Sequence, residues 1–345
     1  MTEPPTERRR GGDYGTNYAE DKVACHDFLE ATYASRLDAI LERDEEEGKV
    51  LPIDLDKLSD FSKSDASLVP RIVKNARRYV QLFEEVADDI LKETMKSRPP
   101  ANFSKKRDVL DVLQEQRQNQ VEEAARADDD PQTADQELAF PAALMRRYEV
   151  RLKAPSTVLA APLREIRAAD IGSLVVTKGI ITRTSEVKPL VEVATYTCDC
   201  CGFEIYQEVG FKKQFLPLQN CPGPQCQKNK IAGRLFLQTR GSKFVKYQEL
   251  RLQELPDQVP IGHIPRSITV QCRGELTRGC APGDMVTLSG IFLPCRYSGF
   301  RALRAGLIAD TYIEAMDVVK HKLSYDEFEL DDEMNSRIDE AWLCV

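Results

Sequence analysis

The spacing of apolar residues changes once along the chain, near residue 147. Before that point apolar side chains recur at steps of three and four, which places them on one face of a helix. The longest such stripe comprises Ile72, Val73, Ala76, Tyr79, Val80, Phe83, Val86, Ala87, Ile90 and Leu91. It predicts one amphipathic helix with a core-facing side, and similar patterns predict further helices over residues 18–34, 107–125 and 137–147.

After residue 147 the period becomes two, and proline or glycine interrupts the pattern about every ten residues. Strands are predicted over residues 174–182, 234–239, 244–252, 267–273, 285–293 and 302–315. About six short strands favour a small Greek-key barrel of the OB-fold type. A β-sandwich is the alternative, because strand number alone does not separate the two. The predicted fold class is a multidomain α+β chain, with a helical bundle followed by an OB-fold barrel.

The domain boundaries follow from composition. Residues 1–16 contain too few apolar side chains to fold and are predicted to be a disordered tail. We expect a helical subdomain over residues 17–150, a β domain over 151–322, and an acidic linker or atypical tail over 323–345. A chain of 345 residues can hold about two domains with cores of their own.

Charge is distributed unevenly between these parts. The whole chain has a net charge of −8, but residues 151–322 contain 24 Lys and Arg against 15 Asp and Glu, which is +9 and leaves −17 for the rest. A positive domain in an acidic chain indicates a polyanionic ligand. The alternative is a basic surface that is only solvated.

Four of the ten cysteines have the spacing of metal ligands. Cys198 and Cys201 form a Cys-x2-Cys pair, and Cys221 and Cys226 follow as Cys-x4-Cys. Two such pairs favour a structural zinc site with four thiolates, in a zinc ribbon inserted at about residues 195–232. A redox dithiol would need no second pair, and a disulfide is disfavoured because the chain shows no secretory signal. Cys200 is expected to be a free surface thiol.

Two basic segments are candidates for contact with a polyanion. Residues 293–304 are predicted to form a hairpin turning at Ser298 and Gly299, which would place Arg296 opposite Arg301. Like charges in that position repel, so either a phosphate lies nearby or the arginines splay into water. In the second segment Lys243 and Lys246 alternate with Phe244 and Tyr247, as in proteins that bind single strands, although Phe244 could instead face the core.

Several motifs resemble one family. They are residues 233–244 (GRLFLQTRGSKF), 247–249 (YQE), 253–254 (QE), 257–260 (DQVP) and 264–270 (IPRSITV). Together they are similar to the amino-terminal half of a minichromosome maintenance (MCM) replicative helicase subunit. The resemblance covers about residues 18–322, and in the helical part it depends on the order of elements more than on motifs.

The resemblance implies an architecture and a set of roles. It implies a helical subdomain and an OB-fold with an inserted zinc ribbon, in which Cys198, Cys201, Cys221 and Cys226 hold structural zinc and the ribbon supports ring-to-ring contact in double hexamers. It implies a channel hairpin that carries Arg296, Arg301 and Arg304 toward DNA. It also implies a control loop over residues 254–266 that couples the amino-terminal ring to the motor ring. The residues carried over to that loop are Glu254, Asp257, Gln258 and Arg266, and further DNA contacts are expected at Arg183, Lys188, Lys243 and Lys246.

The motor of such helicases is not expected in this chain. No Gly-x4-Gly-Lys-Ser/Thr phosphate loop occurs, so we expect no catalytic residues and no ATP hydrolysis from these residues alone. Residues 341–345 also do not resemble the passage into the motor domain. The expected partners are single- and double-stranded DNA, other MCM subunits in a hetero-hexameric ring and double hexamer, and replication initiation factors, in the nucleus and without a membrane.

Two other classes of function are alternatives. A zinc-stabilised protein interaction module without nucleic-acid binding would explain the cysteines equally well. A zinc hydrolase is disfavoured, because four thiolates leave no open coordination position and His26, His263 and His321 are far apart in sequence.

Overall fold

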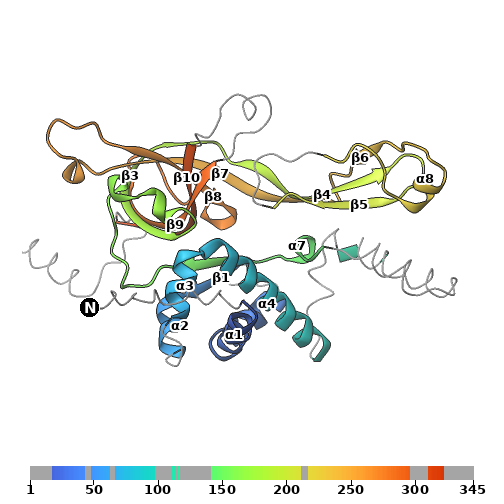
Figure 1. Cartoon of the computed structure of the whole chain (residues 1–345), viewed down its shortest axis with the longest axis horizontal. Coiled ribbons are helices and arrows are strands. Elements are labelled where there is room, and N and C mark those ends of the chain that lie inside the picture. The colour runs from blue at the N-terminus through green and yellow to red at the C-terminus, as the bar shows by residue number, and fades with distance from the viewer. Residues whose placement is uncertain are drawn as a thin grey trace, which may run out of the picture.

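The protein consists of a helical subdomain that lies against a β domain, from which a long arm extends to one side (Figure 1). The computed structural model describes residues 18–42, 48–62, 67–97, 111–112, 116, 141–210, 217–295 and 310–321. The terminal segments predicted as tail and linker, and the helix predicted over 107–125, lie essentially outside these residues.

The helical subdomain is built around two long helices. Its helices are α1 (Tyr18–Leu41), α2 (Leu55–Phe61), α3 (Leu68–Lys74), α4 (Ala76–Ser97) and, beside the β domain, α7 (Ala142–Met145). Phe28 of α1 and Tyr79 and Phe83 of α4 are fully buried between them, so the apolar stripe does face a core as predicted. Within the described residues, no helix is both long and apolar enough to cross a membrane.

The stripe belongs to two helices, and the prediction of one continuous helix was wrong. Asn75 leaves helical geometry with φ −132° and ψ 49°, and it ends α3 before α4 begins at Ala76. Its side-chain amide donates a hydrogen bond to the Tyr18 hydroxyl at 3.0 Å. Only one residue departs from the helix, so the spacing of apolar residues continues across the break. Helix α1 is also longer than predicted and is kinked at Tyr33.

A pair of strands within this subdomain was not predicted. Strand β1 (Val50–Asp54) pairs in parallel with β2 (Glu149–Lys153), almost a hundred residues later. Leu51 and Ile53 alternate inward along β1. The alternation covers only five residues and includes Pro52, which disfavours a central strand but is compatible with the edge position that β1 occupies.

The β domain contains a closed five-stranded barrel. Its strands are β3 (Leu174–Thr184), β7 (Lys243–Gln253), β8 (Ser267–Arg273), β9 (Met285–Cys295) and β10 (Asp310–Lys320). They follow the order β3-β9-β10-β8-β7, and β7 also pairs with β3 to close the sheet. Only the β8–β10 pair is parallel among these neighbours. Closure with this order is the OB-fold topology, which excludes the β-sandwich alternative.

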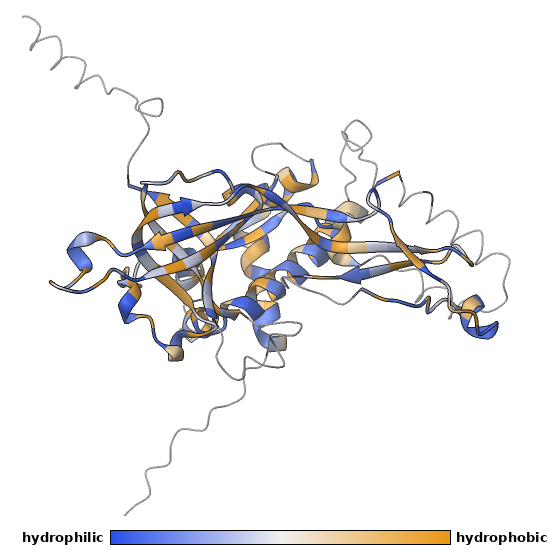
Figure 2. Ribbon diagram, turned by 90° about the horizontal axis from the view of Figure 1, so that it is seen from above, coloured by the Kyte–Doolittle hydropathy of each residue, from blue (hydrophilic) through white to orange (hydrophobic). Residues whose placement is uncertain are grey.

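The arm is an insertion between β3 and β7. It contains β4 (Lys188–Cys198), β5 (Glu204–Glu208), β6 (Leu235–Leu237) and the short helix α8 (Pro224–Lys228). The first half of β7 pairs with β4, so β7 runs from the arm into the barrel, and hydrophilic and hydrophobic residues alternate along these long strands (Figure 2). Most of β4 was not predicted as a strand.

The predicted register of the β9–β10 hairpin was wrong in its described part. A turn at Ser298 and Gly299 would place Cys295 opposite Ala302, but Cys295 pairs with Asp310 and Leu293 with Tyr312. Residues 296–309, including the predicted turn, lie outside the described residues. Within the described residues β10 spans Asp310–Lys320, and the predicted start of this strand near residue 302 lies outside them.

The described residues also include four short 3-10 helices: η1 (Leu163–Glu165), η2 (Ala168–Asp170), η3 (Pro256–Gln258) and η4 (Gly274–Leu276).

The outer face of the barrel packs on the helical subdomain. Leu174, Ile291, Leu293 and Met316 join the core of that subdomain, and a separate core fills the barrel interior. The two parts therefore share an apolar interface.

Candidate metal centre and nucleic-acid interface

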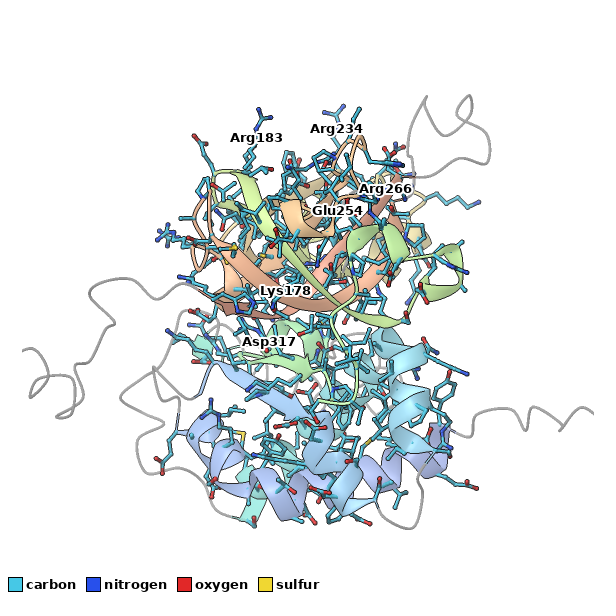
Figure 3. All side chains as sticks on the ribbon, turned by 90° about the vertical axis from the view of Figure 1, so that its left-hand side faces the viewer. Lys178, Arg183, Arg234, Glu254, Arg266 and Asp317 are labelled. Atoms are coloured by element: carbon cyan, nitrogen blue, oxygen red, sulfur yellow. The ribbon has the colours of Figure 1, made fainter. Side chains whose placement is uncertain are left out.

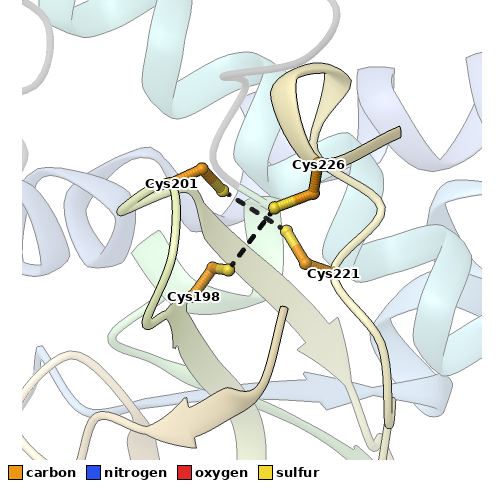
Figure 4. Close-up of side chains that lie close together, drawn as sticks. All are labelled: Cys198, Cys201, Cys221 and Cys226. Atoms are coloured by element: carbon orange, nitrogen blue, oxygen red, sulfur yellow. Dashed lines mark hydrogen bonds between the residues drawn. The ribbon is translucent and has the colours of Figure 1, made fainter. Parts of the chain in front are cut away.

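The four cysteines with ligand spacing meet at the end of the arm. Their sulfur atoms all lie within 4.8 Å of one another, with 3.9 Å between Cys198 and Cys226 and 3.5 Å between Cys201 and Cys221 (Figure 4). Zinc bound to four thiolates at about 2.3 Å requires sulfur atoms about 3.8 Å apart. The cluster thus has the size of a tetrahedral zinc site. Cys200 is exposed and lies outside it.

The backbone of the arm shapes this cluster. Gly202 has a positive φ of 69° in the turn that brings Cys201 beside Cys198. At Gly233 a Cβ atom would lie 2.5 Å from the Cys198 sulfur and 3.2 Å from the Cys226 sulfur. The backbone N–H of Gly223 donates to the Cys221 sulfur at 3.3 Å. Only glycine at position 233 leaves the sulfur atoms in these positions.

The electrostatics of the cluster favour a cation. Backbone N–H groups of Cys201 and Cys200 lower the pKa of the Cys198 thiol to about 7. The neighbouring sulfur of Cys201 and burial raise the pKa of the Cys226 thiol. Several thiolates crowd one another at this distance, and a divalent cation between them would favour the ionised form of all four. The donor set and its size therefore fit structural zinc.

Two of the lysines proposed for DNA contact have partners within the protein. Lys243 Nζ lies 2.7 Å from Glu192 Oε2 and donates to the Ala143 carbonyl at 2.9 Å. Lys246 Nζ lies 3.3 Å from Glu275 Oε1 on a more exposed surface. Phe244 is 39% exposed, and the Tyr247 hydroxyl donates to Glu249. The polar side chains of residues 243–247 are therefore largely engaged in contacts within the protein, at the base of the arm.

Arginines without such partners gather on the barrel. Arg183 on β3 pairs in register with Arg251 on β7, and both are exposed. Arg251 and the exposed Arg266 both line a surface hollow of about 450 Å³ beside η1. None of the three forms an ion pair with another described residue. Arg183 points away from the helical subdomain (Figure 3), and like charges facing each other across a ladder are relieved by an anion.

Hydroxyl groups hold the Arg251 side chain in place. Its Nε donates to Ser267 Oγ at 3.0 Å and its Nη1 to Thr269 Oγ1 at 3.0 Å. These contacts orient the guanidinium without neutralising it. Sequence reasoning missed Arg251. In the sequence, the position of Arg251 between Leu250 and Leu252, which are buried, indicates that its side chain points outward. That Arg183 lies opposite it follows only from the pairing of β3 with β7. Lys188, at the start of β4, is exposed.

The loop after β7 leaves the barrel at the end opposite the arm (Figure 1). Glu254, at its start, is buried and accepts hydrogen bonds from Arg164 Nε at 3.1 Å, from Arg164 Nη2 at 2.8 Å and from the Arg266 backbone N–H at 3.0 Å. Burial would raise the pKa of Glu254, but these donors outweigh it and lower the pKa. The two ends of the loop are thereby fastened together, while Ile261 and Ile264 are fully or largely exposed at its tip.

The other residues named from sequence are placed as follows. Asp257 is exposed and Gln258 half-buried, both in η3. Arg296, Arg301 and Arg304 lie outside the described residues, so their arrangement stays a prediction. Figure 3 also shows Arg266 and Glu254 close together, in agreement with the hydrogen bond from the Arg266 backbone N–H to Glu254.

Comparisons with known proteins agree with this architecture. The family model described as the MCM N-terminal domain matches residues 24–153, and the model described as the MCM OB domain matches residues 162–296. The chain is 42% identical over 331 residues to "DNA replication licensing factor MCM7" of Oryza sativa subsp. indica, covering 94% of the chain and 44% of that relative.

Relatives of the same name occur in distant organisms. The chain is 45% identical to the Arabidopsis thaliana protein, covering 84% of the chain and 38% of the relative. It is 41% identical to the Xenopus tropicalis protein, covering 90% and 43%. The chain thus spans about two fifths of the length of these relatives. Two adjacent family matches and this identity over most of its length show that the chain belongs to the minichromosome maintenance family and contains that family's N-terminal and OB domains.

Proposed function

We propose that this region binds DNA and forms part of the ring of a replicative helicase in the nucleus. Its partners would be other MCM subunits in a hetero-hexamer, a second hexamer met through the arm, and replication initiation factors. The relatives are named as DNA replication licensing factors, and the family match supports this assignment. ATP hydrolysis would belong to a motor domain outside the residues of this chain.

Zinc would act as a structural element of this region. Cys198, Cys201, Cys221 and Cys226 would hold it and complete a zinc ribbon at the end of the arm. Zinc supplies folding free energy to a small insertion that lacks a large core. The short distances between the four sulfur atoms support this proposal, as does the close approach of Gly233 to two of them, which leaves no room for a Cβ atom.

The observation that best supports DNA binding is the group of arginines on the barrel. Arg183 and Arg251 lie opposite each other on β3 and β7, and Arg266, directly before β8, lines the same hollow as Arg251. All three are exposed and have no carboxylate partner among the described residues. Phosphate groups would satisfy them, with the hydroxyls of Ser267 and Thr269 keeping Arg251 oriented. Lys188 and the predicted hairpin residues Arg296, Arg301 and Arg304 would extend this path, whereas Lys243 and Lys246 would contribute less.

The loop over residues 254–266 would act as the control loop between the two rings. Glu254, held by Arg164 and Arg266, would fix its base, and Asp257 and Gln258 would lie on its rising side. The exposed Ile261 and Ile264 would meet an apolar surface of the motor ring. The fastened base supports this role, since a loop with fixed ends presents its tip with less loss of entropy.

Fluorescence anisotropy with a labelled single-stranded oligonucleotide tests the DNA-binding proposal. Affinity of the zinc-loaded chain should fall steeply between about 50 and 200 mM salt, because cations on the protein release counterions from the strand. The double variant Arg183→Ala/Arg251→Ala should reduce the slope of log K against log salt by about 1.4, which is about 0.7 for each lost phosphate contact.

The matched control removes the same charge elsewhere. Lys74 and Lys92 are exposed on the helical subdomain, so Lys74→Ala/Lys92→Ala lowers the net charge equally and should leave the slope unchanged. Equal losses in the two double variants would show a nonspecific effect of net charge. A wild-type affinity that does not depend on salt would refute DNA binding and would favour a protein interaction module.

A further inference from the structure

A cluster of charged side chains lies between the helical subdomain and the base of the arm. Arg146 Nη1 is 2.6 Å from Glu84 Oε2, and Arg146 Nη2 is 2.6 Å from Asp88 Oδ2. The Tyr148 hydroxyl donates to Asp88 Oδ1 at 2.6 Å. These contacts join α4 to the segment that leads from α7 into β2.

The same segment is joined to the arm. Lys243 Nζ on β7 donates to the carbonyl of Ala143 in α7 and lies 2.7 Å from Glu192 Oε2 on β4. The α7 segment is therefore held on one side by α4 and on the other by the strands that begin the arm. A change in this cluster would alter how the helical subdomain meets the arm.

Among the described residues, the cluster contains one more negative charge than positive charge. Its carboxylates are Glu84, Asp88 and Glu192, and its cations are Arg146 and Lys243. The side chains of Arg146, Glu84 and Asp88 are only 10%, 17% and 12% exposed, so solvent screens the surplus poorly. The Tyr148 hydroxyl also faces the cluster within the part of the chain that the structure describes; it donates to Asp88, and burial raises its pKa and keeps it neutral.

A proton is the simplest way to balance this charge. Burial raises the pKa of Glu84 to about 7, against the opposing effect of Arg146 and Lys243 and with a further rise from Glu192 and Asp88. In an opened interface Glu84 would be solvated and would return to an ordinary pKa of about 4.3. Between about pH 4.3 and 7 the closed form would therefore bind a proton that the open form would release.

We propose that this cluster is a proton-operated latch, which fastens the helical subdomain to the base of the arm when Glu84 is protonated and loosens as Glu84 ionises. The direction of the pH dependence follows from the ionisation of Glu84 in the closed and open forms. The closed form is most favoured at low pH, loses stability relative to the open form as pH rises from about 4.3, and reaches a constant, lower stability above about 7. Opening would also release Lys243 and Glu192 at the root of the arm.

Hydrogen exchange followed by mass spectrometry tests the latch on the zinc-loaded full chain. After correction for intrinsic exchange rates, peptides covering residues 142–148 and 188–193 should open about tenfold more readily at pH 7.5 than at pH 6. Zinc content is measured at each pH, so that loss of metal is distinguished from loosening. Unchanged opening of these peptides across this range would overturn the proposal.

Three variants sharpen the result. Glu84→Gln should abolish the pH dependence and keep both peptides as protected as in the wild type at pH 6. Glu85→Gln changes the adjacent, exposed carboxylate, whose partner is Arg78, and should retain the wild-type pH dependence. Lys243→Met enlarges the negative surplus and should shift the loosening to higher pH. Equal behaviour of the Glu84→Gln and Glu85→Gln variants would also overturn the latch.

Discussion

Gly233→Ala should weaken zinc binding without removing a ligand. The new methyl group would lie 2.5 Å from the Cys198 sulfur and 3.2 Å from the Cys226 sulfur. An ordinary contact needs at least about 3.4 Å, so the Cys198 sulfur would have to move by about 1 Å, whereas metal–ligand distances tolerate about 0.2 Å. Gly233 has no positive φ, so the effect would be steric rather than a backbone strain.

The size of the effect follows from overpacking. An extra methyl group in a well-packed interior costs about 1–3 kcal/mol, which is about a 5- to 150-fold lower zinc affinity at about 1.4 kcal/mol per factor of ten. Competition with a chromophoric zinc chelator measures this affinity directly. The fold of the barrel should persist, because its core is separate from the cysteine cluster.

Gly241→Ala is the matched control on the same arm. A Cβ atom at Gly241 would meet nothing closer than Thr195 Cγ2 at 3.4 Å, so its zinc affinity should stay within about twofold of the wild type. An unchanged affinity in Gly233→Ala would show that the metal does not require the sulfur positions described, and the tetrahedral site would then be wrong.

Three further changes address the thiol set, the loop and the helical core. Cys200→Ser should keep one zinc per chain by mass spectrometry while Cys226→Ser loses it, and the reverse result would require a different ligand set. Arg164→Ala leaves the buried Glu254 carboxylate without its main partner, so limited proteolysis should cut within residues 254–266 faster than in the wild type; equal rates would mean that the Arg266 N–H suffices. Tyr33→Phe removes the acceptor of the Asp54 N–H, which should lower the free energy of unfolding by about 1–3 kcal/mol in urea, and a loss below about 0.5 kcal/mol would show that water replaces the hydroxyl.

The strands of the barrel were predictable because each has an inward face of its own. Leu250, Leu252, Val270, Cys272 and Leu288 alternate toward one core, and a period of two is visible in any single strand. The cysteine pairs were predictable for a similar reason, since their spacing is local. Strand order was not, because the parallel contact of β8 with β10 joins residues about forty apart.

Elements without a pattern of their own were missed. Strand β1 is five residues long and acquires a partner only from β2, so nothing near it in sequence identifies it. The break at Asn75 was hidden because one non-helical residue hardly shifts the apolar period. In the described part of the β9–β10 hairpin, Cys295 pairs with Asp310; a two-residue turn at Ser298 and Gly299 does not predict this pairing, because the barrel sets it through the contact of β10 with β8.

The roles of individual cations depend on contacts that sequence spacing does not contain. Lys243 and Arg251 lie on the same strand, and alternation places both away from the barrel core. Lys243 meets Ala143, a hundred residues earlier, and Glu192, so its charge is used within the protein. Among the described residues the Arg251 side chain donates to hydroxyls and faces Arg183, so its charge would remain available to a phosphate. The hydrogen bond from Lys243 to α7 therefore makes Arg251, rather than Lys243, the better candidate for the proposed DNA contact.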